Sequence, residues 1–215
     1  RGRTWHRDRG RAGAGRRPAL TVDPAGRELY LALESGRLSQ AEWNLRTAQT
    51  LGLTEAENLM GRAWADVQPA QDVIALAKAA REAGLVVGML SNSFGLDPYD
   101  PYAHIGVWDL FDVTVISERV GIAKPDPAIY QLALDRMGLA GPECVFVDDQ
   151  AVNLLPAAAL GLTTVHADPA TNYLPHLTRL LDLPPAVGRR PADAVPAVGS
   201  RCAPTPGQEQ QPASH

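Results

Sequence analysis

Four runs of mostly apolar residues constrain the fold of this chain more than any other feature of its sequence. They lie at residues 85–90, 113–116, 144–147 and 163–166. A strand that is apolar on both faces must be covered on both faces, as in a parallel sheet flanked by helices. Helical patterns between the last three runs, over residues 127–137 and 153–160, fit this arrangement. The chain is therefore predicted to be an α/β protein with a parallel sheet.

The residues before the first run carry helix signals without strands between them. Ser39 and Thr54 each stand three residues before a glutamate, which is the pattern of a capping box at a helix start. We expect two or three short helices here. They would form a small accessory module over residues 23–68, followed by an α/β core over residues 69–183.

The two ends of the chain lack the composition of a packed core. Residues 1–22 hold seven arginines against one aspartate, and residues 184–215 hold seven prolines and no Leu, Ile, Met or aromatic residue. Both segments are predicted to be disordered, and the first is also interpreted as sequence foreign to the fold. With Trp5 as its only aromatic residue, the arginine-rich arm is not expected to bind nucleic acid.

Composition narrows the cellular setting. Two cysteines, Cys144 and Cys202, provide no disulfide framework, and no stretch approaches the roughly 18 apolar residues of a membrane span. The arginine-rich start is not followed by the apolar segment of a secretory signal. We expect a soluble cytoplasmic protein without a membrane partner.

Polar residues follow two of the apolar runs. Ser91 and Asn92 come after the first run, and Asp148 and Asp149 come after the third. Functional groups in parallel sheets gather beyond the carboxyl ends of the strands, so these residues are predicted to share one edge. Two adjacent carboxylates beside apolar protein favour a cation, and Mg²⁺ prefers oxygen ligands. The alternative is that Asp149 merely caps the next helix.

Lys124 is one of only two lysines, and it precedes a proline-led helix start. An ammonium can neutralise both a carboxylate and a phosphoryl oxygen. Ser91 and Asn92 can donate hydrogen bonds to the same phosphoryl group. Taken alone, Lys-Pro is usually a solvated helix start and Ser-Asn a common turn. Together with the acidic pair they predict a magnesium-dependent phosphoryl-transfer site. The aromatic loop at residues 97–102 is interpreted as structural, although it could contact substrate.

These residues resemble three motifs of the haloacid dehalogenase-like hydrolase superfamily, most of whose members are magnesium-dependent phosphatases. The similarity lies in Leu90-Ser91-Asn92, in Lys124-Pro125-Asp126, and in Val147-Asp148-Asp149 with Asn153. The resemblance implies a Rossmann-like core with a shortened helical cap. It further implies roles for five residues: phosphate binding by Ser91 and Asn92, charge stabilisation by Lys124, magnesium ligation by Asp149, and orientation of a bound water by Asp148.

One family motif has no clear counterpart here. Family members begin with a central strand ending in Asp-x-Asp, whose first aspartate is the nucleophile. This chain offers a weak strand ending in Asp23, with no carboxylate two residues later. We interpret the chain as a truncated or misread gene product. Either the segment near Leu20 fills the central position of the sheet, or the chain is poorly stable.

The resulting prediction is a phosphatase that acts on a small phosphorylated metabolite through an aspartyl-phosphate. The alternative is a catalytically inactive relative that binds phosphate or a partner. A haloacid dehalogenase is less favoured, because that chemistry needs no metal and its enzymes usually lack the acidic pair. Substrate identity and oligomeric state stay open.

Overall fold

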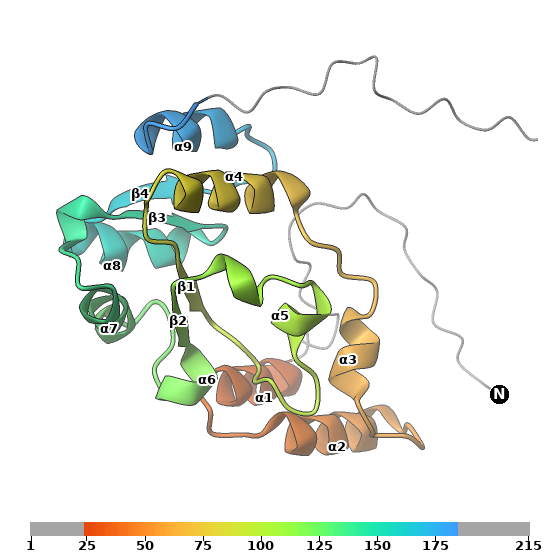
Figure 1. The fold of residues 1–215 in the computed structure, drawn as a ribbon. Coiled ribbons are helices and arrows are strands. Elements are labelled where there is room, and N and C mark those ends of the chain that lie inside the picture. The colour runs from red at the N-terminus through yellow and green to blue at the C-terminus, as the bar shows by residue number, and fades with distance from the viewer. Residues whose placement is uncertain (1–23, 185–215) are drawn as a thin grey trace, which may run out of the picture. The chain divides into compact units, whose positions relative to one another are not determined.

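The computed structural model describes residues 24–184. The predictions on residues 1–22, on Asp23 and on the segment beyond residue 184 therefore lie outside the described residues. Helices and strands alternate along the second half of the described chain (Figure 1). The helices are α1 (Pro24–Glu34), α2 (Gln40–Leu51), α3 (Leu59–Trp64), α4 (Gln71–Glu82), α5 (Pro101–His104), α6 (Ser117–Val120), α7 (Pro127–Met137), α8 (Leu154–Ala159) and α9 (Leu174–Leu180), with 3-10 turns η2 (Trp108–Leu110), η3 (Gly141–Glu143) and η4 (Ala151–Asn153). The strands are β1 (Gly88–Ser91), β2 (Val113–Ile116), β3 (Val145–Asp148) and β4 (Thr163–His166).

The strands form two parallel pairs. β1 pairs with β2 and β3 pairs with β4, with Ser91 opposite Ile116 and Asp148 opposite His166. Helices α4 and α9 lie on one side of the β3–β4 pair, and α7 and α8 lie on the other (Figure 1). This confirms the α/β class and the parallel strands. The expected single sheet is divided, because no described strand pairs with both β1 and β3.

The first predicted strand begins later than expected. Residues 85–87 precede β1, and Leu85 and Val86 are 39% and 47% exposed. β2 begins at Val113, opposite Gly88, and just before it the Asp112 amide donates to the Val87 carbonyl at 2.8 Å, so Leu85 and Val86 lie beyond the paired stretch. An apolar run alone does not define where a strand pairs.

Of the two helix starts predicted in the accessory helices, one is confirmed and the other is wrong. Ser39 caps α2 in a capping box with Glu42, as predicted. The prediction at Thr54 is wrong, because the next helix starts at Leu59 and its N-cap is Asn58. The Asn58 side chain accepts a hydrogen bond from the Gly61 backbone, so a different polar residue satisfies that helix end.

The described residues hold two separate hydrophobic clusters. One joins α1, α2 and α3 and is centred on Leu33, Trp43 and Met60, each at most 2% exposed. The other lies between the strands and helices α7 and α8, around Val115 and Ile129. The two clusters correspond to the accessory helices and to the α/β part.

Gln40 connects these two parts. From the first turn of α2 its side-chain amide donates to the Tyr99 carbonyl at 2.9 Å and accepts from the Tyr99 amide at 2.8 Å. Gln40 is 2% exposed, so both hydrogen bonds are shielded from water. Phe94, from the loop after β1, also packs in the helical cluster.

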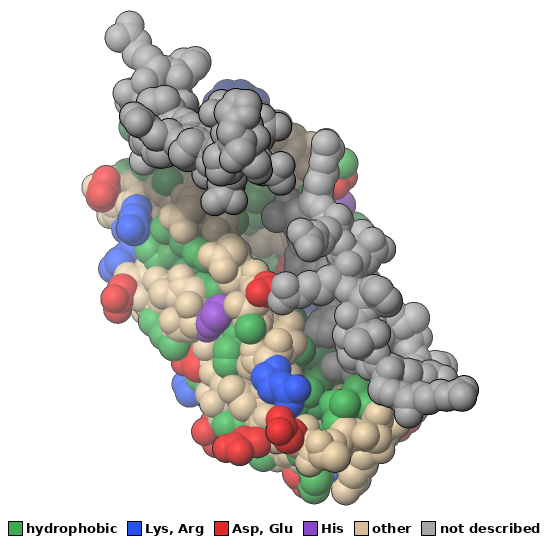
Figure 2. Space-filling model, turned by 90° about the vertical axis from the view of Figure 1, so that its right-hand side faces the viewer, with side chains coloured by type: hydrophobic (Ala, Val, Ile, Leu, Met, Phe, Trp, Pro, Cys, Tyr) green, Lys and Arg blue, Asp and Glu red, His purple; other side chains and the backbone are tan. Residues whose placement is uncertain are grey.

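None of the helices between residues 24 and 184 is long and apolar enough to cross a membrane. On the face seen in Figure 2, Lys and Arg side chains of the described part are scattered among acidic ones and do not form a single patch.

Candidate functional site

The candidate site lies at the carboxyl edge of the two strand pairs. Ser91 is the last residue of β1 and Asp148 is the last residue of β3. Lys124 comes from the loop between α6 and α7. The fold brings the Lys124 side chain into contact with Asp148, while Ser91 lies at the end of the other strand pair; that these residues act as one site stays a prediction.

A buried ion pair joins two of these residues. The Lys124 Nζ donates to the Asp148 Oδ2 at 2.6 Å, and their side chains are only 10% and 4% exposed. The ammonium also lies 5.6 Å from the centre of the Phe146 ring. Each charge is therefore neutralised locally, in surroundings where an unpaired charge would be costly.

Asp148 has further donors on its other oxygen. Its Oδ1 accepts from the Gln150 backbone at 2.7 Å and from the Asn153 side chain at 3.0 Å. Asn153 itself is 3% exposed. These contacts use most of the acceptor capacity of the carboxylate and fix its orientation toward Lys124. The role of Asp148 in orienting a metal-bound water stays a prediction.

Asn92 holds the backbone of Lys124 in place. Its Oδ1 accepts from the Lys124 amide at 2.8 Å, and its Nδ2 donates to the Lys124 carbonyl at 2.9 Å. Both ends of the Asn92 amide are thus engaged within the protein. The structure gives Asn92 a positioning task, while its predicted contact with phosphate stays a prediction.

Ser91 meets a residue that sequence reasoning assigned only to a loop. The Tyr102 hydroxyl donates to the Ser91 Oγ at 2.6 Å. Tyr102 is the last residue of the aromatic segment 97–102, which we interpret as a structural loop that could contact substrate, and the structure places it in α5. The clustering of Tyr, Asp and Pro over residues 97–102 was the only sequence signal for this neighbour.

Asp149 differs from its neighbour Asp148 in exposure. Asp149 is exposed, and the hydrogen bond found there joins its backbone carbonyl to the His166 ring at 3.0 Å. Burial, together with the charges of Asp72 and Asp149, raises the pKa of the nearby Tyr173. The Asp149 carboxylate is therefore the acidic group at this edge that is most accessible to a cation.

A magnesium ion fits this donor set in part. Mg²⁺ usually takes one or two protein carboxylates, keeps several waters and binds substrate phosphate. Asp149 can supply one carboxylate. Within residues 24–184, no group of three His, Cys, Asp or Glu side chains is placed to hold a metal.

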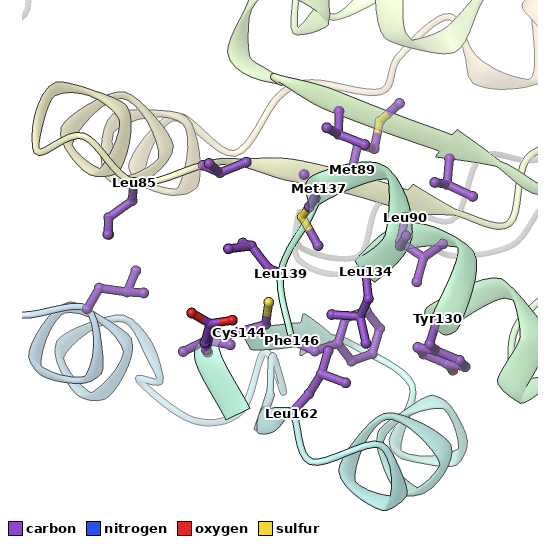
Figure 3. A pocket seen from close by; sticks show the side chains of 18 of the residues that line it. Leu85, Met89, Leu90, Tyr130, Leu134, Met137, Leu139, Cys144, Phe146 and Leu162 are labelled. Atoms are coloured by element: carbon purple, nitrogen blue, oxygen red, sulfur yellow. The ribbon is translucent and has the colours of Figure 1, made fainter. Parts of the chain in front are cut away.

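Two cavities of about 520 Å³ each lie between the strand pairs, and the second of them reaches this site. Five strand residues line both of them: Gly88, Met89, Leu90, Val145 and Phe146. The first cavity opens toward α7, and Figure 3 shows Leu90, Phe146 and Tyr130 around it. The second lies beneath α4 and α9 and is lined at the carboxyl edge by Lys124, Asp148 and Asp149.

Comparison with known proteins gives one matching family model, that of the haloacid dehalogenase-like hydrolases, over residues 17–161. The mouse acyl-CoA dehydrogenase family member 10 is 38% identical over 108 residues, which are 50% of this chain and 10% of that protein. The glyceraldehyde 3-phosphate phosphatase of Methanopyrus kandleri is 30% identical over 103 residues, which are 47% of this chain and 44% of the phosphatase. This chain therefore spans less than half the length of each of these relatives.

A solved structure shares the fold. It is a HAD family enzyme from Bacteroides thetaiotaomicron, crystallised with magnesium and inorganic phosphate. The likeness has a TM-score of 0.58 at 26% identity and covers 69% of this chain and 78% of that one.

Proposed function

Because a family model matches more than half of its length, the chain belongs to the haloacid dehalogenase-like hydrolases, and we propose that it hydrolyses a small phosphorylated metabolite with magnesium. The main support for this proposal is the buried Lys124–Asp148 ion pair. It lies at the carboxyl edge of the strands, where β1 ends at Ser91 and Asp149 follows β3. Support for phosphate and magnesium comes from the phosphatase of M. kandleri and from the ligands of the B. thetaiotaomicron enzyme.

In this proposal Lys124 stabilises charge on the transferring phosphoryl group. Its ammonium is fixed by Asp148 at its tip and by Asn92 along its backbone, so little reorganisation is needed when substrate binds. The Ser91 hydroxyl donates a hydrogen bond to a second phosphoryl oxygen. The positive charge and the hydroxyl together hold the phosphate at the carboxyl edge.

Asp149 is the described residue that would hold magnesium. A bound magnesium ion neutralises phosphate charge in such reactions. The exposed Asp149 carboxylate lines the same cavity as Lys124 and Asp148, so the metal and the ammonium would act on the same phosphoryl group.

Transfer through an aspartyl-phosphate requires a further carboxylate beside Lys124. Asp148 does not suit this role, because Lys124, Gln150 and Asn153 already bind its two oxygens. The sequence candidate, Asp23, lies outside the described residues. The engagement of both Asp148 oxygens within the protein is the specific observation in favour of the second candidate function, a non-catalytic protein that binds phosphate or a phosphorylated partner.

The test is release of phosphate from a generic aryl phosphate with and without magnesium. Lys124→Ala is expected to reduce release by at least about 100-fold, because it removes the main cation of the site. Lys78→Ala is the matched control, since Lys78 is the only other lysine and lies exposed on α4. Circular dichroism of each variant gives the folded fraction by which rates are corrected.

The same experiment separates the two candidates. Magnesium-dependent turnover that is lost in Lys124→Ala and kept in Lys78→Ala supports the phosphatase. No turnover in the wild type, with binding of inorganic phosphate that needs Lys124, supports the binding protein. If the wild type shows no turnover and no binding of inorganic phosphate, both candidate functions are contradicted.

The acidic pair also argues against a dehalogenase, because carbon–halogen cleavage in this family needs no metal.

We further propose a cytoplasmic setting. The thiol of Cys144 is free, and burial raises its pKa, so it stays a protonated, unreactive side chain.

A further inference from the structure

The hydroxyl of Tyr102 is directed at a residue of the proposed site. Its Oη lies 2.6 Å from the Ser91 Oγ and donates to it. A serine hydroxyl has one hydrogen and two lone pairs, so when it accepts from Tyr102 its own hydrogen must point elsewhere. Apart from the Tyr102 hydroxyl, none of the described groups lies where it accepts a hydrogen bond from the Ser91 Oγ, so when Tyr102 is the donor the serine hydrogen is available to a ligand oxygen.

Tyr102 carries the proton that this contact needs at neutral pH. Burial raises the pKa of the Tyr102 hydroxyl, and the negative charge of Asp100 raises it further, against the opposing hydrogen bonds from Ser91 and Ser93. The phenol therefore keeps its proton. A protonated phenol can donate to Ser91, and in that arrangement the serine hydrogen points away from Tyr102.

Neighbouring groups hold Tyr102 rigidly. The Asp100 Oδ1 accepts from the Tyr102 backbone amide at 2.9 Å, and the Asp100 Oδ2 accepts from the Trp108 Nε1 at 2.9 Å. The Tyr102 ring packs edge-on against Trp108, with 5.1 Å between ring centres. One carboxylate thus fixes both the helix start that carries Tyr102 and the ring against which it packs.

We propose that Tyr102 is a positioning residue, whose hydroxyl orients the O–H of Ser91 toward a phosphoryl oxygen of the substrate. This inference rests on the proposed function of the site. Tyr102 itself need not touch the substrate. Its contribution should therefore pass entirely through Ser91, which makes it separable from a merely structural contribution.

The test is a double-mutant cycle with aryl phosphate as substrate. Tyr102→Phe keeps the ring and is expected to lower kcat about 10-fold while changing KM less than about 2-fold, because the oriented donor acts most strongly on charge in the transition state. In a Ser91→Ala background the same change should have no further effect. Tyr99→Phe is the matched control from the same loop, and its kcat should stay within about 2-fold of wild type.

The outcomes are distinct from those of the proposed function. Equal losses from Tyr102→Phe in both backgrounds, or no loss in either, would overturn the positioning role even if Lys124→Ala abolishes turnover. If the wild type shows no turnover, the proposed phosphatase fails. The same cycle is then measured by binding of inorganic phosphate in ³¹P NMR, where loss of affinity only in the presence of Ser91 supports the inference and any other pattern overturns it.

Discussion

The helical part, α1 to α3, and the α/β part of this molecule are packed in different ways. In the helical part Leu33 and Met60 are fully buried and Trp43 is 2% exposed. In the α/β part, strand residues such as Met89 and Phe146 are only half-buried and line two cavities.

This difference follows from where each element finds its hydrogen bonds. A helix satisfies its backbone groups internally, so three short helices can close a core among themselves. A strand needs a neighbour on each side, and within residues 24–184 β1 and β3 each have one strand partner. Buried side chains in the helical part should therefore contribute more to the free energy of unfolding, residue for residue, than the apolar side chains of the strands.

One large side chain removed from each part tests the difference in packing. Trp43→Ala should cost about 4 kcal/mol of unfolding free energy, because it leaves a large void in a closed core. Phe146→Ala should cost only about 2 kcal/mol, because that ring already borders a cavity. Urea unfolding measures both values, and equal losses would show that the cavities are not present in solution.

The second prediction concerns the buried Lys124–Asp148 ion pair of the α/β part. Asp148→Asn should cost about 3 kcal/mol in magnesium-free buffer, because it leaves the Lys124 ammonium without its counter-charge. Asp149→Asn is the adjacent control. Its side chain is exposed, so its unfolding free energy should stay within about 0.5 kcal/mol of wild type. Similar values for the two variants would argue against the ion pair.

The third prediction addresses the seam between the two parts. Gln40→Ala should cost about 1.5 kcal/mol, because both backbone groups of Tyr99 lose their buried partner. It should also broaden the thermal transition as the parts become less coupled. Gln49→Ala, at an exposed position on the same helix, should leave the transition unchanged. An equally sharp transition in both variants would mean that Gln40 does not couple them.

The smallest effect is expected in acid. Hydrogen bonds from the Ser39 backbone and side chain lower the pKa of Glu42 in the helical part, and the Val87 backbone and Arg81 lower that of Asp112 in the α/β part. A lowered pKa gives stability that is complete above the unfolded-state value and is lost as the pH falls through the folded-state value. Tm should therefore fall below about pH 4. Glu42→Gln and Asp112→Asn should each show a shallower fall than wild type, and an unchanged slope would contradict the contacts.

Local signals and strand-end logic predicted much of what the structure contains. The Ser39 capping box joins two residues that are three positions apart, so both partners can be recognised in the sequence. The position of Asp148 at the carboxyl end of β3 follows from the apolar run that precedes it. Both rest on rules that need no knowledge of side-chain packing.

Other contacts depend on packing and had no such rule. Gln40 reaches Tyr99 across 59 residues, and neither residue type nor spacing marks that pair. Tyr102 finds Ser91 because α5 folds back over the end of β1. The division of the sheet was also not predictable from apolar runs, since these indicate burial on both faces without indicating which strands become neighbours.

Helix α7 has a further consequence for how the molecule opens. It packs against β1 and β2 on one side and against α8, which covers β3 and β4, on the other. Ile129 and Tyr130 of α7 are fully buried at this junction. In native-state hydrogen exchange the amide hydrogens of α7 should therefore exchange with solvent only when α7 separates from both strand pairs. The amide hydrogens of α3 can exchange through a local opening. A single helix thus sets the size of the cooperative unit in the α/β part, which makes it the slowest-exchanging reporter of that unit.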